Sequence, residues 1–201
     1  MERRESRSVA ILCSAGGATD GHVVNTVDDT CASCCNMAAA VGARVIAVVS
    51  STEKVAIAEA AGVHHVVLAD GFAAEVRQLT DGRGVDVIVD PVGGERFTDS
   101  LRSLAREGRL LVVGFAGGEI PVVKTNRLLL TNTTVMGAAT RELWNHQPEM
   151  PRWQWSELMP LLKSGVLDPV IGAQFSIEQT GSAIRTIEER RAAGKVLVRV
   201  R

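Results

Sequence analysis

Short apolar segments alternate with amphipathic segments along most of the chain. The apolar segments are rich in β-branched residues and bounded by Gly, Asp or Ser, which is typical of buried parallel strands. They lie at residues 8–13, 44–50, 64–69, 85–90, 108–115 and 133–138. Helix candidates lie between them, at residues 29–41, 53–61, 73–80 and 95–106. This alternation predicts an α/β fold with a Rossmann-type, doubly wound parallel sheet and right-handed crossovers.

The alternation changes after residue 140. Residues 141–165 carry three tryptophans and three prolines, and they end as a helix that stops at Gly165. Residues 167–201 then follow the pattern of a strand, a helix, a turn and a strand. We therefore predict a coenzyme-binding core over residues 1–140 and a C-terminal αβαβ extension over residues 141–201.

Charge and composition exclude several classes of function. The 201 residues carry 22 basic and 23 acidic side chains, so no broad electrostatic field attracts nucleic acid or an anionic membrane. No apolar run is long enough to span a bilayer, and we expect a cytoplasmic location. The four cysteines, at positions 13, 31, 34 and 35, are too clustered for a disulfide framework. They offer only one C-x-x-C-like element, which favours small core residues over a metal site.

The first candidate site is the glycine turn after the first predicted strand. Gly16, Gly17 and Gly21 precede a helix candidate, and glycines in this position let the backbone approach a pyrophosphate. An ordinary glycine turn is the alternative. Asp20 adds negative charge within the turn, and residues 22–30 form a poor helix. These features predict impaired pyrophosphate binding.

The second candidate site is the end of the second strand. No Asp or Glu stands there to bind the ribose hydroxyls of NAD. Ser50 and Ser51 can donate hydrogen bonds instead, and Lys54 adds a positive charge one turn later. This group suits the 2′-phosphate of NADP. The alternative is that Ser51 or Thr52 caps the helix and Lys54 is simply solvated.

The third candidate site is formed by the ends of two further strands. Asp90, Val92 and Gly93 follow one strand, and Gly114 and Phe115 follow the next. Ligands of open α/β sheets lie beyond the carboxyl ends of the strands, where backbone groups here could reach a ribose or nicotinamide. Turn chemistry alone would also place Gly and Pro at these positions.

Four segments together resemble the coenzyme-binding half of the zinc-free quinone oxidoreductases, in the medium-chain dehydrogenase/reductase superfamily. They are "GARVIAVVSSTEKVAIAEAAG", "VRQLTDGRGVDVIVDPVGGERFTDSLRSLAREGRLLVVGFAGG", "NRLLLTNTTVMG" and "ERRAAGKVLVRV". The resemblance covers residues 42–201 and implies a Rossmann domain with strand order 3-2-1-4-5-6. It also implies NADPH as hydride donor and a quinone or enone as substrate.

The resemblance further implies roles for individual residues. Ser51 and Lys54 would hold the adenosine 2′-phosphate, and Gly114 and Phe115 would lie near the nicotinamide. Residues 133–138 would form the edge strand through which such domains dimerise. No catalytic residue and no metal ligand is assigned, because hydride transfer relies on the chemistry of the coenzyme.

Relatives of this kind carry an N-terminal catalytic domain before the first strand, and we expect that domain to be absent from this chain. We therefore predict weak NADPH binding and poor turnover by the chain alone. The final strand, in residues 195–200, should expose apolar surface that a second copy or a partner chain covers. The alternative function is a non-catalytic binding or interaction module completed by another chain. Half of a metal-dependent alcohol dehydrogenase is disfavoured, because no catalytic zinc ligand set is visible.

Overall fold

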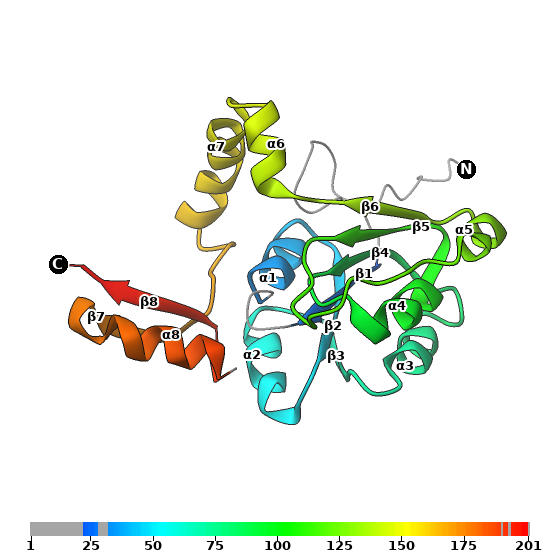
Figure 1. Cartoon of the computed structure of the whole chain (residues 1–201), viewed down its shortest axis with the longest axis horizontal. Coiled ribbons are helices and arrows are strands. Elements are labelled where there is room, and N and C mark those ends of the chain that lie inside the picture. Colours follow the sequence, from blue (N-terminus) through cyan, green and yellow to red (C-terminus); the bar gives the residue numbers. More distant parts are fainter. Residues whose placement is uncertain (1–21, 28–31, 190, 193, 201) are drawn as a thin grey trace.

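The computed structural model describes residues 22–27, 32–189, 191–192 and 194–200. Its main feature is a six-stranded sheet, drawn in Figure 1, whose strands all run parallel to their neighbours. The strands are β1 (His22–Val27), β2 (Arg44–Val49), β3 (His65–Leu68), β4 (Val85–Asp90), β5 (Leu104–Val112) and β6 (Thr134–Gly137). Their order in the sheet is β3-β2-β1-β4-β5-β6, so the predicted Rossmann-type order is confirmed.

Helices cover both faces of the sheet (Figure 1). One face carries α1 (Ala32–Ala40) and α2 (Val55–Ala60), which follows the short helix η1 (Thr52–Lys54). The other carries α3 (Phe72–Leu79) and α4 (Phe97–Ser103), which follows η2 (Gly94–Arg96). A further helix, α5 (Thr125–Thr131), precedes the edge strand β6 and has no counterpart among the helices expected from sequence.

The core explains why the strands are continuously apolar. In β2, Val45 and Val49 pack toward α1 and α2, whereas Ile46 and Val48 pack toward α3 and α4. Successive side chains of a strand point to opposite faces, so a sheet covered on both sides needs apolar residues at nearly every position. β4 follows the same rule, with Val87 and Val89 on one face and Ile88 on the other.

The first strand of the sheet is not the one expected from sequence. Residues 8–13, predicted as that strand, lie outside the described residues. The central position belongs to β1, which pairs with β2 from His22 to Val27 and with β4 from Val23 to Asn25. The poor helix expected from sequence at residues 22–30 is therefore wrong for residues 22–27. The β-branched valines of β1 suit a strand, which agrees with the low helix propensity noted there.

The C-terminal extension forms a separate two-stranded parallel sheet, shown beside the main sheet in Figure 1. The chain passes through α6 (Thr140–His146) and α7 (Met150–Lys163) to β7 (Ile171–Ser176), α8 (Thr180–Glu188) and β8 (Lys195–Arg199). Gly165, predicted as the stop, adopts a left-handed φ of 73° just beyond α7. The Asp168 N–H donates to Asn36 Oδ1 at 2.9 Å, which ties the extension to α1. Among the described residues, no helix is long and apolar enough to cross a bilayer.

Candidate coenzyme-binding edge

The carboxyl ends of β1, β2, β4 and β5 meet along one edge of the sheet, because these strands are parallel and adjacent. The chain runs outward from β1 through β2 to β3, and then crosses to β4 on the other side of β1. Ligands of open α/β sheets bind beyond the carboxyl ends, at the point where the strand order reverses. Here that point lies between β1 and β4.

Ser51 and Lys54 lie directly beyond the end of β2. Ser51 occupies the N-cap position of η1 with extended backbone, but its side chain makes no capping hydrogen bond. The Lys54 N–H donates to the Ser51 carbonyl at 3.2 Å, so one turn of backbone holds the two residues together. The capping role considered for Ser51 is therefore not observed, and its hydroxyl remains available for a ligand.

Asp90 ends β4 and is almost fully buried, with 1% of its surface exposed. Its Oδ1 accepts hydrogen bonds from the N–H groups of Val92 at 2.9 Å and Gly93 at 2.8 Å. A buried carboxylate needs such donors, and the two bonds fold the chain into a tight turn as it leaves the sheet. The Asp90 side chain thus shapes the loop by binding the backbone N–H groups of Val92 and Gly93.

The loops after β4 and β5 continue the pairing of the two strands beyond the sheet. The Val113 N–H donates to the Asp90 carbonyl at 3.0 Å, directly where β4 and β5 end. Further along, the Ala116 N–H donates to the Pro91 carbonyl and the Gly117 N–H to the Val92 carbonyl, both at 2.9 Å. These bonds join the two loops into one unit, which we call the loop ladder (residues 90–94 and 113–119).

Glycines permit this close approach. A Cβ on Gly114 would lie 3.2 Å from the Pro91 carbonyl oxygen, and one on Gly117 would lie 2.9 Å from that of Val92. Gly93 has a left-handed φ of 65°, and its Cβ would meet Phe115 at 3.1 Å. The Phe115 ring itself is 43% exposed. The ladder is therefore a closely packed platform that presents an aromatic ring.

The structure brings some predicted site residues together and leaves others undescribed. Asp90, Val92, Gly114 and Phe115 all belong to the loop ladder, and Ser51 and Lys54 lie at the end of β2 on the same edge. Gly16, Gly17 and Gly21 lie outside the described residues. In chain order they precede β1, whereas the sequence analysis expected them between the first strand and its helix. The sequence analysis missed Gly117, for which the Gly-Gly pair at 117–118 is the only local signal.

The cysteines belong to the protein core where they are described. Cys34 is half-buried and Cys35 fully buried on α1. Within the described ranges, no three His, Cys, Asp or Glu side chains are grouped so that they could hold a metal ion. Cys13 and Cys31 lie outside those ranges.

Comparison with known proteins identifies a family. Residues 32–164 match the family described as zinc-binding dehydrogenase. Quinone oxidoreductase-like protein 2 of Rattus norvegicus is 37% identical over 158 residues, which span 78% of this chain and 45% of the rat protein. Its homologue in Nematostella vectensis is 33% identical over 160 residues, spanning 78% of this chain and 44% of that protein. The chain thus spans less than half the length of these curated relatives.

Solved structures resemble the fold closely. A quinone oxidoreductase from Pseudomonas syringae superposes with a TM-score of 0.77 at 26% identity, over 89% of this chain and 57% of its own. The mycobacterial protein Rv1454c, solved in complex with NADPH, gives a TM-score of 0.78 at 28% identity, over 89% of this chain and 56% of its own.

Proposed function

Because the chain belongs to the zinc-binding dehydrogenase family, as a quinone oxidoreductase-like coenzyme-binding domain, we propose that it binds NADPH at the carboxyl edge of its six-stranded sheet. The observation that carries this proposal is the group of Ser51 and Lys54 at the end of β2. The Ser51 hydroxyl makes no capping bond, and β2 ends without the acidic residue that would bind the ribose hydroxyls of NAD. The solved complex of Rv1454c with NADPH supports the choice of this coenzyme.

The remaining site residues divide into two roles. We assign the 2′-phosphate to Ser51 and Lys54, and the nicotinamide end of the coenzyme to the loop ladder with Gly114 and Phe115. Asp90 and Val92 maintain the ladder, Asp90 by accepting two N–H bonds and Val92 through its carbonyl. A pyrophosphate role for Gly16, Gly17 and Gly21 stays a prediction.

When bound, the coenzyme would supply a hydride to a quinone or enone, which would gain a proton from solvent. The contribution of this chain is to hold the coenzyme in position and to favour NADPH over NADH through the positive charge of Lys54. Activity of the chain alone stays a prediction of weak turnover, and a cytoplasmic location likewise stays a prediction from sequence.

Titration with the two coenzymes tests the phosphate assignment. We expect NADPH to bind at least about tenfold more tightly than NADH, because a charge-assisted hydrogen bond contributes about 1.5–3 kcal/mol. Lys54→Gln should weaken NADPH binding by a similar factor and leave NADH binding unchanged, as measured by nicotinamide fluorescence. Lys163→Gln, on α7, provides the control for the loss of one charge. Equal affinities of the unaltered chain for both coenzymes would contradict the assignment.

The second candidate function is a non-catalytic module completed by another chain, and the C-terminal extension favours it. Ile177, Ile184 and Ile187 are each about half exposed, and Leu197 of β8 is also exposed. We propose that a partner chain covers this surface. Ile184→Gln combined with Ile187→Gln should lower the binding of the dye ANS and leave the unfolding midpoint unchanged. Unchanged dye binding by the double variant would count against a functional apolar surface.

A homodimer through residues 133–138 is the third part of the proposal. β6 is the last strand of the sheet in the described order, so its outer edge has no neighbour within the described part of the chain. The exposed side chain of Met136 lies on this strand. We expect Met136→Lys to shift the chain from dimer to monomer in sedimentation velocity, because a charge at a strand edge opposes pairing. A monomer before the substitution would overturn this proposal.

A further inference from the structure

A cavity lies at the edge of the sheet opposite to the coenzyme edge, at the amino ends of β4 and β5. Its volume is about 450 Å³, within the range of about 300–1,000 Å³ typical of small-molecule sites. It lies between the turn that precedes β4, the start of β5 and the end of α5. The lining residues are Arg77, Gly82, Arg83, Leu104, Ala105, Arg106 and Thr131.

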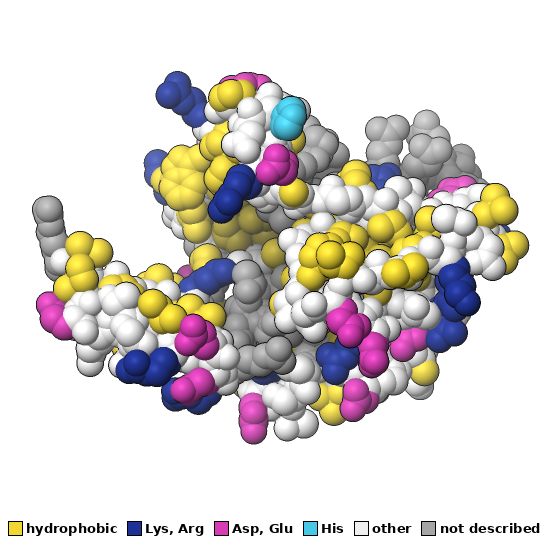
Figure 2. Space-filling model, in the orientation of Figure 1, with side chains coloured by type: hydrophobic (Ala, Val, Ile, Leu, Met, Phe, Trp, Pro, Cys, Tyr) yellow, Lys and Arg dark blue, Asp and Glu magenta, His cyan; other side chains and the backbone are white. Residues whose placement is uncertain are grey.

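The lining combines apolar and basic parts. Leu104 and Ala105 are buried and supply the apolar part, whereas Arg77, Arg83 and Arg106 are exposed and supply guanidinium groups. Figure 2 shows basic side chains gathered on this side of the molecule, below α5. No carboxylate lines the cavity among the described residues.

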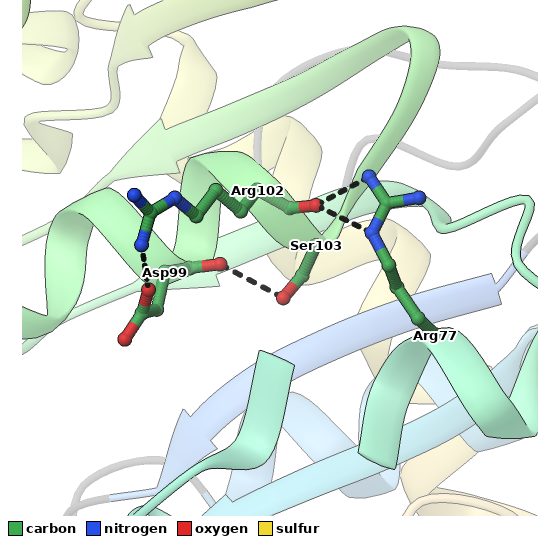
Figure 3. A network of polar contacts seen from close by, with 4 residues as sticks. All are labelled: Arg77, Asp99, Arg102 and Ser103. Atoms are coloured by element: carbon green, nitrogen blue, oxygen red, sulfur yellow. Dashed lines mark hydrogen bonds and ion pairs between the residues drawn. The ribbon is translucent and has the colours of Figure 1, made fainter. Parts of the chain in front are cut away.

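Arg77 is held in a fixed orientation by backbone carbonyls. Its Nε and Nη2 donate to the Arg102 carbonyl at 3.2 and 2.8 Å, and its Nη1 donates to the Gly82 carbonyl at 2.9 Å. Asp99 is the only acidic residue drawn in Figure 3. Its carboxylate accepts a hydrogen bond from the Arg102 side chain at 3.0 Å and lies away from Arg77. Arg77 is thus hydrogen-bonded to neutral carbonyl groups, which leave its positive charge in place. The same bonds fix the plane of its guanidinium group before any ligand binds.

The other two arginines differ from each other. Arg83 forms an ion pair with Asp86, and this hydrogen bond raises the pKa of Arg83 above its ordinary value. Arg106 makes no hydrogen bond or ion pair with any described residue. The cavity therefore presents two cationic groups without a carboxylate partner, Arg77 and Arg106, beside one that is already paired.

The wall of the cavity is rigid. The Thr80 hydroxyl donates to the Val76 carbonyl at 2.8 Å and accepts the Gly84 N–H at 3.0 Å, which fixes the turn that carries Gly82 and Arg83. A Cβ on Gly84 would lie 2.7 Å from the backbone of Leu104, so the turn and β5 are in close contact. A preformed site loses little conformational entropy when a ligand binds.

We propose that this cavity binds a small organic carboxylate, whose charged group contacts Arg77 and Arg106 and whose apolar body packs on Leu104 and Ala105. Guanidinium groups match the geometry of a carboxylate through paired N–H donors. An inorganic anion would leave the apolar part of the cavity unfilled. Because the coenzyme edge lies at the other ends of β4 and β5, a ligand here would bind together with NADPH and not in competition with it.

Calorimetric titration of the full chain with benzoate tests the proposal, with benzyl alcohol and inorganic phosphate as comparison probes. We expect saturable benzoate binding and weaker binding of both other probes. Arg106→Gln should weaken benzoate binding by up to about fivefold, as expected for the loss of one exposed charge. The Arg106 side chain is exposed and makes no hydrogen bond or ion pair with a described residue, so this variant should fold normally. Arg141→Gln, an exposed arginine on α6 outside the cavity, should bind benzoate as the unaltered chain does.

Several results would overturn the proposal. Absence of saturable benzoate binding below about 10 mM would exclude a specific site. Equal benzoate affinity in Arg106→Gln and the unaltered chain would exclude the assigned contact. Benzyl alcohol binding as tightly as benzoate would exclude the role of charge, and phosphate binding as tightly would exclude the role of the apolar part. Displacement of benzoate by NADPH would place the anion at the coenzyme edge instead.

Discussion

The two sheets of this protein are both parallel, yet their surroundings differ. In the six-stranded sheet, every residue of β2 after Arg44 is buried, because helices cover both faces. In the two-stranded sheet, no residue of β7 or β8 is buried, and α8 is the helix that packs against both strands. Parallel sheets are found almost only where both faces are covered, and two-stranded sheets alone are marginal in water. Parallel strand pairing is thus covered by the chain's own helices in the six-stranded sheet, whereas the two-stranded sheet keeps exposed surface.

The largest expected effect is on the free energy of unfolding, and it compares a core residue of the six-stranded sheet with a residue of α8 in the C-terminal extension. Ile88 of β4 is 0% exposed, whereas Ile184 of α8 is 51% exposed. Ile88→Ala should lower the free energy of unfolding by about 2–5 kcal/mol, through lost burial and a residual cavity. Ile184→Ala should change it by no more than about 0.5 kcal/mol. Urea unfolding of both variants gives the comparison, and similar losses would show that α8 is packed as tightly as the main core.

An intermediate effect is expected at the edge of the six-stranded sheet. Asp90→Ala leaves the N–H groups of Val92 and Gly93 without their acceptor, which should cost about 1–3 kcal/mol of stability. Asp90→Asn keeps a side-chain oxygen in place and should cost less. Amide hydrogen exchange at Val92 and Gly93 locates the change. If Asn were as harmful as Ala, the charge of Asp90 and not its geometry would hold the loop.

The smallest expected effect lies in η3 (Ile177–Gln179), the short helix directly before α8. Hydrogen bonding with Ser176 and with its own backbone lowers the pKa of Glu178 below its ordinary value. A carboxyl group whose pKa is lowered by folding adds stability above its unfolded value, about 4.3, and loses it as the pH falls through the lowered value. Glu178→Gln should therefore destabilise the chain slightly at neutral pH and not at all in strong acid.

Thermal unfolding followed by circular dichroism from neutral to acidic pH measures this difference. Glu59→Gln, on α2 of the other region, provides the control for the loss of one negative charge. If the difference in unfolding midpoint between Glu178→Gln and the unaltered chain stayed constant with pH, it would contradict the assigned hydrogen bond. If this difference disappeared in acid, it would show that α8 depends on local capping, as expected for a helix with little buried surface.

Most of the six-stranded sheet was predictable because its strands carry a strong local signal. β2 and β4 are rich in β-branched residues, and two-sided burial produces this pattern. The first strand was not predictable in this way. Residues 8–13 and 22–27 are both rich in β-branched or aliphatic residues, and the sequence analysis chose the more apolar one. Pairing with β2 and β4 identifies the strand, and such pairing is not a local property.

The candidate site was predictable in position but not in detail. Parallel strands place Ser51, Asp90 and Gly114 at one edge, and that follows from the strand assignment alone. The role of Asp90 depends on the direction of a buried side chain, and the loop ladder joins segments more than twenty residues apart. The cavity beside Arg77 combines residues from four segments, and no spacing along the chain reveals it.

The central position of β1 has a consequence for synthesis of the chain. β2 and β3 follow β1 directly and can pair on one side of it while the ribosome is still translating. The partner on its other side, β4, ends at Asp90, so that edge of the nascent sheet stays open until the ribosome has passed this residue. An open strand edge can recruit a strand from another chain. Slow translation between residues 50 and 90 would therefore lengthen the period in which a newborn chain is prone to aggregation.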